Sequence, residues 1–349
     1  MADRLDISQR KKDHLALCAG PNVGFRAKTT LLEQVQLVHC ALPQMHADDV
    51  DSRTELLGKT LSAPVIVAAM TGGTDRAAEV NRDIARAADE LGLGFGVGSQ
   101  RAMFERPDTT WTFRVRDVAP NVLLLGNLGM VQAQKMSTAQ IQELIGEIGA
   151  DALCVHFNPA MEIVQPGGDR DFAGGLEVLQ RLVEELGTPV VAKETGCGFS
   201  RAVAQKIQSV GVRAIDVSGS GGTSWVAVEA HRAVDEDDRA LADELWDWGI
   251  PTAASVAQCS GLGLQIIATG GLQSGSDVVR AIALGATAGG LAAAVLRAQK
   301  AGGYEGAKTF LRRVVMSVRA QMLLTGCRTV DELRRAPKIL GPDLQRWVP

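Results

Sequence analysis

The sequence has few aromatic residues and no closely paired cysteines. Both absences reduce the number of functions that the protein could have. Aromatic residues make up 4% of the 349 residues, which does not favour the stacking surfaces that bind single-stranded nucleic acid. Without a C-x-x-C pair, the cysteine spacing indicates neither a zinc site nor a disulfide framework. We therefore expect buried free thiols at all six cysteines, which are Cys18, Cys40, Cys154, Cys197, Cys259 and Cys327.

The sequence also lacks a strong charge of either sign and a long hydrophobic run. The formal net charge of −4 gives no overall field that would attract nucleic acid or an anionic membrane, so any anion must be bound locally. No apolar run approaches the roughly 20 residues of a membrane span, and the amino terminus lacks the basic-then-apolar pattern of a secretory signal. We expect a cytoplasmic location, with no nucleic-acid partner and no membrane association.

The residues that are present predict an α/β fold with a large core. Hydrophobic residues make up 46% of the chain and charged residues 22%, which is typical of a globular protein. Short apolar segments alternate with amphipathic helical patterns at 75–91, 138–148, 175–186, 201–210 and 276–284. Because eight such strands close a barrel, we predict a (β/α)8 TIM barrel. The predicted strands are 64–69, 94–98, 122–125, 152–156, 189–193, 214–218, 265–269 and 286–291.

We predict one domain over residues 1–349, with additions at three places. Residues 1–61 precede the first strand and are expected to form an arm or cap near the barrel mouth, before a barrel at 62–300. Residues 301–349 are expected to form carboxyl-terminal helices. The stretch 219–254 is expected to be a long loop insertion after strand six, and long loops at this face are commonly lids or substrate walls.

Polar residues at the predicted strand ends are the first candidates for the active site, since barrel enzymes place their catalytic groups there. Strand four is followed by His156, Asn158 and Glu162, a base, an amide and a carboxylate. Mg²⁺ is typically held by one or two carboxylates together with substrate phosphates. A hydrogen-bonded core histidine and a solvated loop carboxylate remain open alternatives. The other strand ends supply Thr71, Ser99, Gln100, Arg101, Asn127 and Lys193.

Glycine-rich segments after the last three strands predict a phosphate site. The run 218–223, the pair Gly270-Gly271 and the segment 289–292 lie where barrels commonly bind phosphate through main-chain N–H groups and a helix start. Glycines needed only for tight turns are the alternative. The run 94–98 is glycine-rich too, but its spacing does not fit a dinucleotide fingerprint and it is itself a predicted strand.

A basic cluster at 10–14 stands out near the start of this acidic chain. Arg10 and Lys11 on an arm could close over a diphosphate through charge-assisted hydrogen bonds. An ordinary solvated surface is the alternative interpretation.

Taken together, the motifs resemble the type II, flavin-dependent isopentenyl-diphosphate isomerases, from about residue 10 to residue 349. The resemblance implies reversible 1,3-allylic isomerisation of isopentenyl diphosphate to dimethylallyl diphosphate in isoprenoid biosynthesis. It also implies reduced FMN as the acid and base, Mg²⁺, NADPH as reductant, and a homo-oligomer, tetrameric or octameric. It rests on Arg10-Lys11, Ala69-Met70-Thr71-Gly72-Gly73, Gly98-Ser99-Gln100-Arg101, Gly126-Asn127-Leu128-Gly129, His156-Phe157-Asn158, Gln165-Pro166, Gly168-Asp169-Arg170, Lys193-Glu194, Gly221-Gly222-Thr223-Ser224-Trp225 and Gly270-Gly271-Leu272.

The same resemblance implies roles for individual residues. Reduced FMN itself would be catalytic, supported by Lys193, His156 and Asn158, and Glu162 would bind the metal. Residues around FMN would be Ala69, Met70, Thr71, Gly72, Ser99, Asn127, Lys193, Ser218, Thr223, Gly270, Gly271, Leu291 and Ala292. Substrate-binding residues would be Arg10, Lys11, Ser99, Gln100, Arg101, His156, Asn158 and Met161.

Two positions depart from the family pattern. Met161 and Gly167 stand where the family has Gln and Glu, and a methionine cannot transfer or relay a proton. We expect retained but slower isomerase activity, or action on a different or bulkier allylic substrate. The alternative functions are an FMN-dependent oxidoreductase of the same barrel type, acting on a small organic substrate by hydride transfer, and a non-catalytic homologue that binds flavin or prenyl diphosphates.

Overall fold

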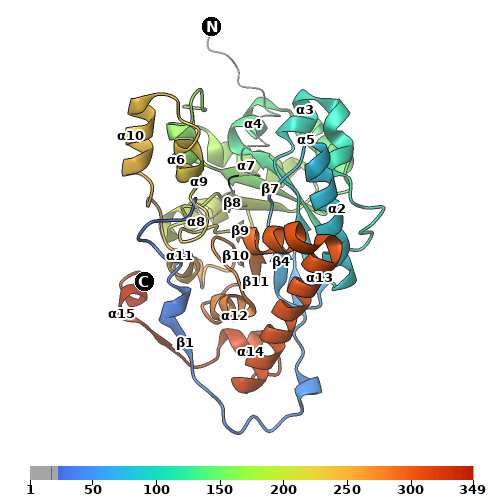
Figure 1. Cartoon of the computed structure of the whole chain (residues 1–349), viewed down its shortest axis with the longest axis vertical. Coiled ribbons are helices and arrows are strands. Elements are labelled where there is room, and N and C mark those ends of the chain that lie inside the picture. Colours follow the sequence, from blue (N-terminus) through green and yellow to red (C-terminus); the bar gives the residue numbers. More distant parts are fainter. Residues whose placement is uncertain (1–16, 18–22, 349) are drawn as a thin grey trace.

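Eight parallel strands close into a barrel in the computed structural model, which describes residue 17 and residues 23–348 (Figure 1). The strand order is β10-β11-β4-β5-β6-β7-β8-β9, so the first and last barrel strands are neighbours. Each strand overlaps the range expected from the sequence, which confirms the predicted barrel. The strands are β4 (Val65–Val67), β5 (Gly94–Gly96), β6 (Leu123–Gly129), β7 (Ala152–Phe157), β8 (Val190–Glu194), β9 (Ala214–Asp216), β10 (Gln265–Ala268) and β11 (Ala288–Leu291).

Amphipathic helices cover the outside of the barrel because each has one apolar face to bury. In α2, Val80 and Ile84 are buried with the barrel residues in one core, and the Thr74 side chain accepts a hydrogen bond from the Ala77 N–H at 3.2 Å, capping the first turn. The five predicted helices are all present, as α2 (Asp75–Glu90), α5 (Thr138–Gly146), α7 (Gly175–Glu185), α8 (Arg201–Ser209) and α12 (Gly275–Ala283). Shorter helical segments follow the strands, namely α3 (Arg101–Glu105), η3 (Pro107–Phe113), α4 (Met130–Lys135) and α6 (Pro159–Val164).

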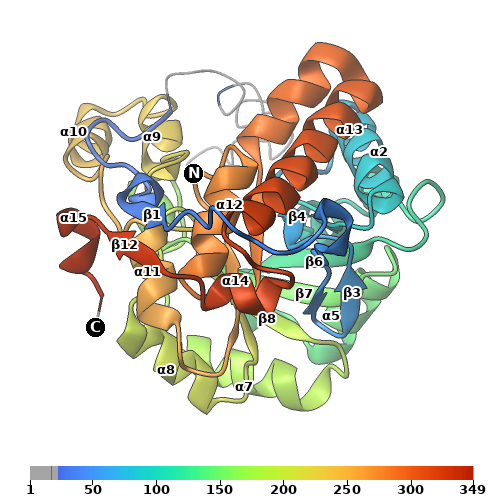
Figure 2. The same cartoon turned by 90° about the horizontal axis from the view of Figure 1, so that it is seen from below.

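The part of the arm that the structure describes is divided between different places in the molecule. Residues 23–30 lie at the mouth, where Gly24 forms a β-bridge with Thr223 and the Ser224 N–H donates to the Val23 carbonyl at 2.8 Å. Further along, η1 (Leu32–Gln34) leads into β1 (Val35–Leu37), which pairs antiparallel with β12 (Lys338–Leu340) near the carboxyl terminus (Figure 2). The arm therefore contacts both the carboxyl-terminal region and the mouth. A short helix, η2 (Ala47–Asp49), follows β1.

The hairpin of β2 (Thr54–Leu56) and β3 (Lys59–Leu61) lies at the opposite end of the barrel. The Lys59 ammonium contacts the Asp151 carboxylate at 2.8 Å, just before β7 begins. Leu56 and Leu61 are buried with the side chains of the barrel interior. The expectation that residues 1–61 all cap the mouth is wrong for this hairpin, because its two leucines close the apolar bottom of the barrel.

The insertion expected after β9 is present, and it carries short helices within the loop. It contains α9 (Trp225–Ala230) and α10 (Glu236–Glu244), and it ends as α11 (Thr252–Cys259) begins. The insertion contains an acidic run, Asp235-Glu236-Asp237-Asp238. This run has a structural role, since the Asp235 carboxylate caps α10 by accepting the Asp237 N–H at 2.8 Å. The other acidic residues of the run fall in the first turn, where the helix dipole favours negative charge.

The carboxyl-terminal region begins with a long bent helix. Helix α13 (Ala293–Leu324) starts two residues after β11 and is interrupted at Gly302 and Gly303, of which Gly303 has a φ of +58°. It therefore crosses the expected boundary at residue 300. After it come α14 (Val330–Arg334), β12 and α15 (Pro342–Gln345), so this region is not helical throughout. No helix among the described residues has the length and apolar character needed to cross a membrane.

Candidate active site

A buried ammonium group lies at the carboxyl ends of three neighbouring strands. Strand pairing aligns His156 of β7 with Lys193 of β8, and Lys193 with Asp216 of β9. The Lys193 Nζ donates to Asp216 Oδ2 at 2.8 Å and to the Thr269 hydroxyl at 3.4 Å. Lys193 is 7% exposed and Asp216 is 3% exposed. Because desolvating an ion pair offsets much of its attraction, this pair points to a functional role, and an ammonium has three N–H donors of which these contacts use two.

His156 is held beside this pair as a neutral imidazole. Burial, together with the Lys193 charge, lowers the His156 pKa from 6.5 to about 4. Its Nδ1 lies 2.8 Å from the Asn127 side-chain oxygen, so Nδ1 carries the proton and Nε2 is left as an acceptor. A diphosphate oxygen is also an acceptor. His156 therefore binds such a group directly only if the ligand's negative charge raises the histidine pKa and brings a second proton.

The segment after β7 orients a buried carboxylate. The Asn158 amide donates to Glu162 Oε1 at 2.8 Å, and the Asp169 N–H donates to Glu162 Oε2 at 2.9 Å. Glu162 is 9% exposed, so the solvated-loop alternative does not hold. The Asn158 amide also lies 3.7 Å from the Met161 sulfur.

Glu162 is a single carboxylate, so it could supply only part of the ligands that a metal ion needs. Among residue 17 and residues 23–348, no group of three or more His, Cys, Asp or Glu side chains could enclose a metal ion. One carboxylate is compatible with Mg²⁺, which usually keeps several waters and takes its remaining ligands from substrate phosphates. A buried, unpartnered Gln165 Oε1 lies close by, on the residue whose amide nitrogen is 3.4 Å from Glu162 Oε2. The donor set fits a cation shared with a phosphorylated substrate.

The glycines of the predicted phosphate site are required by backbone packing. A Cβ on Gly222 would come within 2.4 Å of the Gly271 nitrogen, and a Cβ on Gly270 within 2.2 Å of the Gly219 carbonyl. Gly270 and Gly271 also have φ values of +97° and +81°. The tight-turn interpretation is therefore correct for these residues, and it is compatible with phosphate binding. Ser218, with a φ of 35°, adds a strained non-glycine conformation of the kind that concentrates at functional sites.

Helix α13 offers main-chain donors next to these glycines. Leu291 is fully buried in the hydrophobic core, so its side chain is not open to a ligand. The Leu296 N–H donates to the Ala292 carbonyl at 3.0 Å, closing the first helical turn, and Ala292 provides no side-chain cap. The preceding N–H groups have no acceptor within the helix and carry its partial positive charge. Because β10 and β11 are neighbours, these groups and the Gly270-Gly271 turn could bind one phosphate.

The residues predicted after β4 and β5 differ in how they are placed. Ala69 and Met70 are half-buried, whereas Thr71 and Gly72 are buried. A Cβ on Gly72 would overlap the Phe113 ring at 2.0 Å, so this glycine is also required by packing. Ser99 and Thr223 are half-buried at the mouth.

Gln100 does not face the mouth. It is 1% exposed, its amide donates to the Leu144 carbonyl at 2.8 Å, and its oxygen accepts the Asn127 N–H at 3.0 Å. The expectation that Gln100 binds substrate is therefore corrected, because its donors and acceptor tie α5 to β6. Arg101 is half-buried and its guanidinium contacts Glu105 at 2.6 Å. The predicted arm residues Arg10 and Lys11 lie outside the described residues.

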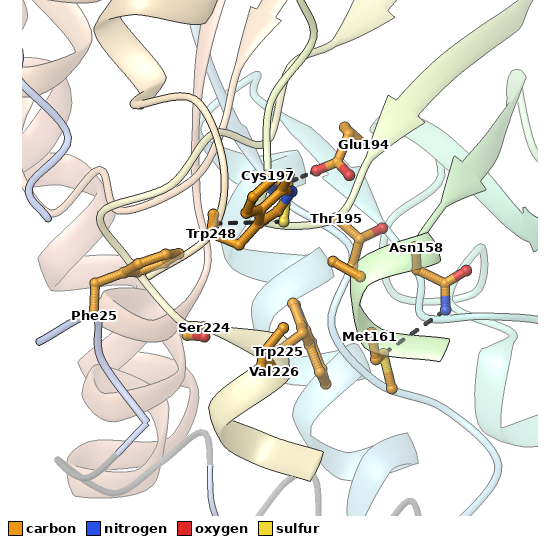
Figure 3. Close-up of a pocket in the computed structure, with 12 residues that line it drawn as sticks. Phe25, Asn158, Met161, Glu194, Thr195, Cys197, Ser224, Trp225, Val226 and Trp248 are labelled. Atoms are coloured by element: carbon orange, nitrogen blue, oxygen red, sulfur yellow. Dashed lines mark hydrogen bonds between the residues drawn. The ribbon is translucent and has the colours of Figure 1, made fainter. Parts of the chain in front are cut away.

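A cleft that is partly open to solvent lies between α6, the end of β8, the start of α9 and the arm (Figure 3). Aromatic side chains from three separate segments, Phe25, Trp225 and Trp248, line it together with Met161. The Thr195 hydroxyl, also in the lining, is a buried atom without a hydrogen-bond partner. The cleft therefore joins an apolar surface to an unsatisfied polar group.

Glu194 lies in the wall of the same cleft. Its Oε2 accepts the main-chain N–H groups of Cys197 and Gly198, and burial raises its pKa to about 8. Sequence reasoning assigned no role to Glu194, Phe25, Trp225 or Trp248. Glu194 and Trp225 were visible within motifs, and Trp248 within the insertion, whereas nothing in the sequence pattern distinguished Phe25.

Comparison with known proteins shows the family of the chain. A family model described as FMN-dependent dehydrogenase matches residues 4–106 and 128–339. The chain is 42% identical over 348 residues to the isopentenyl-diphosphate delta-isomerase of Pyrococcus horikoshii, covering 97% of this chain and 94% of that one. The chain belongs to the isopentenyl-diphosphate delta-isomerase family. The protein of that name from Methanothermobacter thermautotrophicus is also 42% identical, over 345 residues that cover 98% of this chain and 96% of the relative.

Solved structures share the fold of this isomerase family member at lower identity. A mandelate oxidase variant with a monooxide FMN adduct aligns with a TM-score of 0.66 and 22% identity, over 96% of this chain and all of that one. Mandelate oxidase with (S)-2-phenylpropionate gives the same TM-score and identity, over 96% of this chain and 98% of the other. At this identity the likeness shows the fold alone.

Proposed function

We propose that the chain catalyses the reversible 1,3-allylic isomerisation of isopentenyl diphosphate to dimethylallyl diphosphate, with reduced FMN at the barrel mouth. One observation carries the proposal. In a member of the isomerase family, His156, Lys193 and Asp216 are aligned on adjacent strand ends, and Lys193 is buried there as an ammonium. Such a fixed cation suits a ligand that becomes negatively charged, because a low-dielectric site strengthens the interaction.

The groups at the mouth fit FMN. The phosphate would be bound by main-chain N–H groups of the Gly270-Gly271 turn and of the start of α13. Lys193 has a third N–H, beyond those directed at Asp216 and Thr269, which would stabilise negative charge on the pyrimidine edge of the flavin. The buried, unpartnered hydroxyls of Thr195 and Ser220 are further donors in the loops that follow β8 and β9.

Moving an unactivated double bond requires a proton to be added at one carbon and removed at another. Ordinary side-chain acids protonate such an alkene poorly near neutral pH. Reduced FMN, when bound, supplies a ring nitrogen that exchanges this proton, while the chain supplies placement and electrostatics. The apolar cleft beside Met161 and Trp225 would hold the hydrocarbon part of the substrate and exclude water.

The diphosphate would be bound at the polar side of the mouth. Glu162, oriented by Asn158 and the Asp169 N–H, would share Mg²⁺ with diphosphate oxygens. Arg10, Lys11 and Arg101 would add positive charge, and Ser99 a hydroxyl. His156 would bind after gaining a second proton from the solvent.

Three finer features belong to the same proposal. NADPH would act as reductant only to prime the flavin, since the isomerisation has no net redox change. The protein would act in the cytoplasm. It would assemble as a homo-oligomer, tetrameric or octameric, as the resemblance implies.

The test is anaerobic incubation of the purified chain with FMN, NADPH, Mg²⁺ and isopentenyl diphosphate, followed by product analysis. We expect dimethylallyl diphosphate to form and to approach an equilibrium that is also reached from the product side. Absence of conversion from either side, in protein that retains FMN, would remove the isomerase proposal.

A hydride-transferring oxidoreductase is the second candidate. The match to a family described as FMN-dependent dehydrogenase favours it, and so does Met161, which lacks the proton-relaying group expected of an isomerase. It predicts net oxidation or reduction of a small organic substrate. A non-catalytic homologue, favoured by Met161 alone, would bind FMN and turn over no five-carbon diphosphate.

A further inference from the structure

The main chain of the arm segment that borders the cleft is bound by Asp247, a side chain of the insertion. The Asp247 carboxylate accepts two consecutive main-chain N–H groups, that of Arg26 at Oδ1 and that of Ala27 at Oδ2, both at 2.8 Å. Hydrogen bonds to an ionised carboxylate are about twice as strong as neutral ones. We call this contact of Asp247 with Arg26 and Ala27 the Asp247 clasp.

Other contacts around the clasp are made by side chains of the arm. The Arg26 guanidinium lies 3.8 Å from the centre of the Trp246 ring and contacts the Asp243 carboxylate at 2.7 Å. Lys28 Nζ donates to the Gly249 carbonyl at 2.6 Å. Arg26 and Asp243 are both about half exposed, so their ion pair contributes little.

The main chain of the arm is anchored on both sides of the clasp. On one side Gly24 forms its β-bridge with Thr223, and on the other the Ala253 N–H donates to the Thr30 carbonyl at 2.9 Å. Between these anchors, Asp247 binds the main-chain N–H groups of Arg26 and Ala27, while at the Gly24 anchor the Trp246 indole N–H donates to the Gly24 carbonyl at 2.9 Å. Loss of the clasp would therefore loosen residues 25–29 while the anchors and the barrel remain in place.

The clasp joins two residues that neighbour the cleft lining. Phe25 precedes Arg26 and Trp248 follows Asp247, and both aromatic side chains line the cleft (Figure 3). We propose that Asp247 is a positioning residue: by fixing the main chain at Arg26 and Ala27, it sets Phe25 and Trp248 as a wall of the cleft that binds the hydrocarbon part of the substrate. The substrate part of this inference rests on the proposed function, whereas the structural part does not.

The first experiment measures amide hydrogen exchange in the holoenzyme of the wild type and of Asp247→Ala, Asp247→Asn and Asp243→Asn. We expect exchange at Arg26 and Ala27 to be about tenfold faster in Asp247→Ala, since each of these N–H groups loses a hydrogen bond to a charged acceptor. Asp247→Asn keeps one acceptor oxygen and should give a smaller increase. Asp243→Asn, which removes a partner of the Arg26 side chain alone, should match the wild type. Unchanged exchange in both Asp247 variants would overturn the clasp.

The second experiment measures isomerase kinetics and FMN content in the same variants. We expect KM for isopentenyl diphosphate to rise about tenfold in Asp247→Ala, as a lost charged hydrogen bond allows, with kcat and FMN content changed less than about threefold. The KM of Asp247→Asn should lie between those of Asp247→Ala and the wild type. The asparagine variant also tests the proposal if the alanine variant fails to fold. Faster exchange with an unchanged KM would overturn the positioning role. If the wild type itself shows no turnover, the proposed function fails, and the exchange result alone decides the clasp.

Discussion

Lys193 is a buried cation whose partner is also buried. If Lys193 is removed, Asp216 is left at 3% exposure without the ammonium that lies 2.8 Å away, and breaking such a pair costs roughly 3–5 kcal/mol. The effect of Lys193→Ala on FMN would therefore be mixed with an effect on folding. A second substitution that neutralises Asp216 separates the two.

We predict that Lys193→Ala lowers FMN retention or flavin reduction about tenfold or more, because the fixed positive charge beside the flavin is lost. The measurement is bound FMN per folded chain, together with the rate of anaerobic reduction by NADPH. In Lys193→Ala/Asp216→Asn the unpaired buried charge is removed, so Tm should recover while the flavin defect persists. Full activity in Lys193→Ala would refute the role.

His156 makes stability depend on pH in a defined window. Below pH 6.5 the unfolded chain protonates this histidine, whereas the folded chain keeps it neutral down to its pKa of about 4. Stability therefore falls as pH decreases from 6.5 to about 4, by about 3 kcal/mol from this residue. Burial raises the Glu194 pKa to about 8, so this residue makes stability fall as pH rises. The pH range of this opposite effect overlaps part of the range set by His156.

The histidine effect is measured as a difference between the wild type and His156→Gln in urea unfolding at pH 4.5, 5.5, 6.5 and 7.5. We expect the wild type to lose stability relative to His156→Gln as pH falls below 6.5. Above pH 7 the difference between the two proteins should be constant. A difference that does not change with pH would contradict a neutral, half-buried His156.

Met161 places a thioether where a proton-relaying amide is expected from the resemblance. Its sulfur lies 3.7 Å from the Asn158 amide, so a glutamine oxygen at this position could accept a stronger hydrogen bond. We predict that Met161→Gln raises kcat for isopentenyl diphosphate several-fold, and that Met161→Leu, the matched apolar control, does not. If glutamine gives no increase, Met161 is an adaptation to another substrate or to a flavin that performs both proton transfers.

At the scale of elements, the hairpin of β2 and β3 serves stability at the end of the barrel opposite the site. Leu56 is fully buried among the interior side chains. We predict that Leu56→Ala lowers the free energy of unfolding by about 2–5 kcal/mol, with FMN content per folded chain unchanged. Thr60→Ala, at an exposed position of the same hairpin, should change stability by less than about 0.5 kcal/mol. Loss of FMN from folded Leu56→Ala would contradict this separation.

Elements whose pattern is local were predictable from the sequence. The eight strands and the helices α2, α5, α7, α8 and α12 follow from apolar periodicity, and the strand ends brought Lys193, His156 and Asn158 to one opening as expected. The helices of the insertion were missed because α9 has only six residues and the acidic run at the start of α10 resembles a solvated loop. That run forms the N-cap and first turn of α10.

Features that depend on contacts distant in the chain were not predictable. In sequence, the hairpin is as polar as the rest of the arm. Only the packed interior of the barrel shows where Leu56 and Leu61 are buried. Gln100 looked like a mouth residue because it follows a strand, but its bonds to Leu144 and Asn127 turn it inward. Phe25 lines the cleft because Asp247, 222 positions later in the sequence, fixes the main chain next to it.

In the whole molecule, the residues that stabilise the fold and the residues of the candidate active site lie at opposite ends of the barrel. The barrel interior at the hairpin end is apolar, whereas the opposite end holds the buried ion pair, the neutral histidine, the oriented carboxylate and the aromatic cleft. Because conversion of isopentenyl diphosphate to dimethylallyl diphosphate transfers no net electrons, an enzyme with this mouth should turn over many substrates for each reduction of its flavin.

The most direct measurement is the ratio of dimethylallyl diphosphate formed to NADPH consumed, under anaerobic conditions with FMN and Mg²⁺ present. The proposed function predicts a ratio far above one, since NADPH only primes the flavin. A ratio of one or less, with NADPH consumed in step with substrate, would contradict it and favour the oxidoreductase.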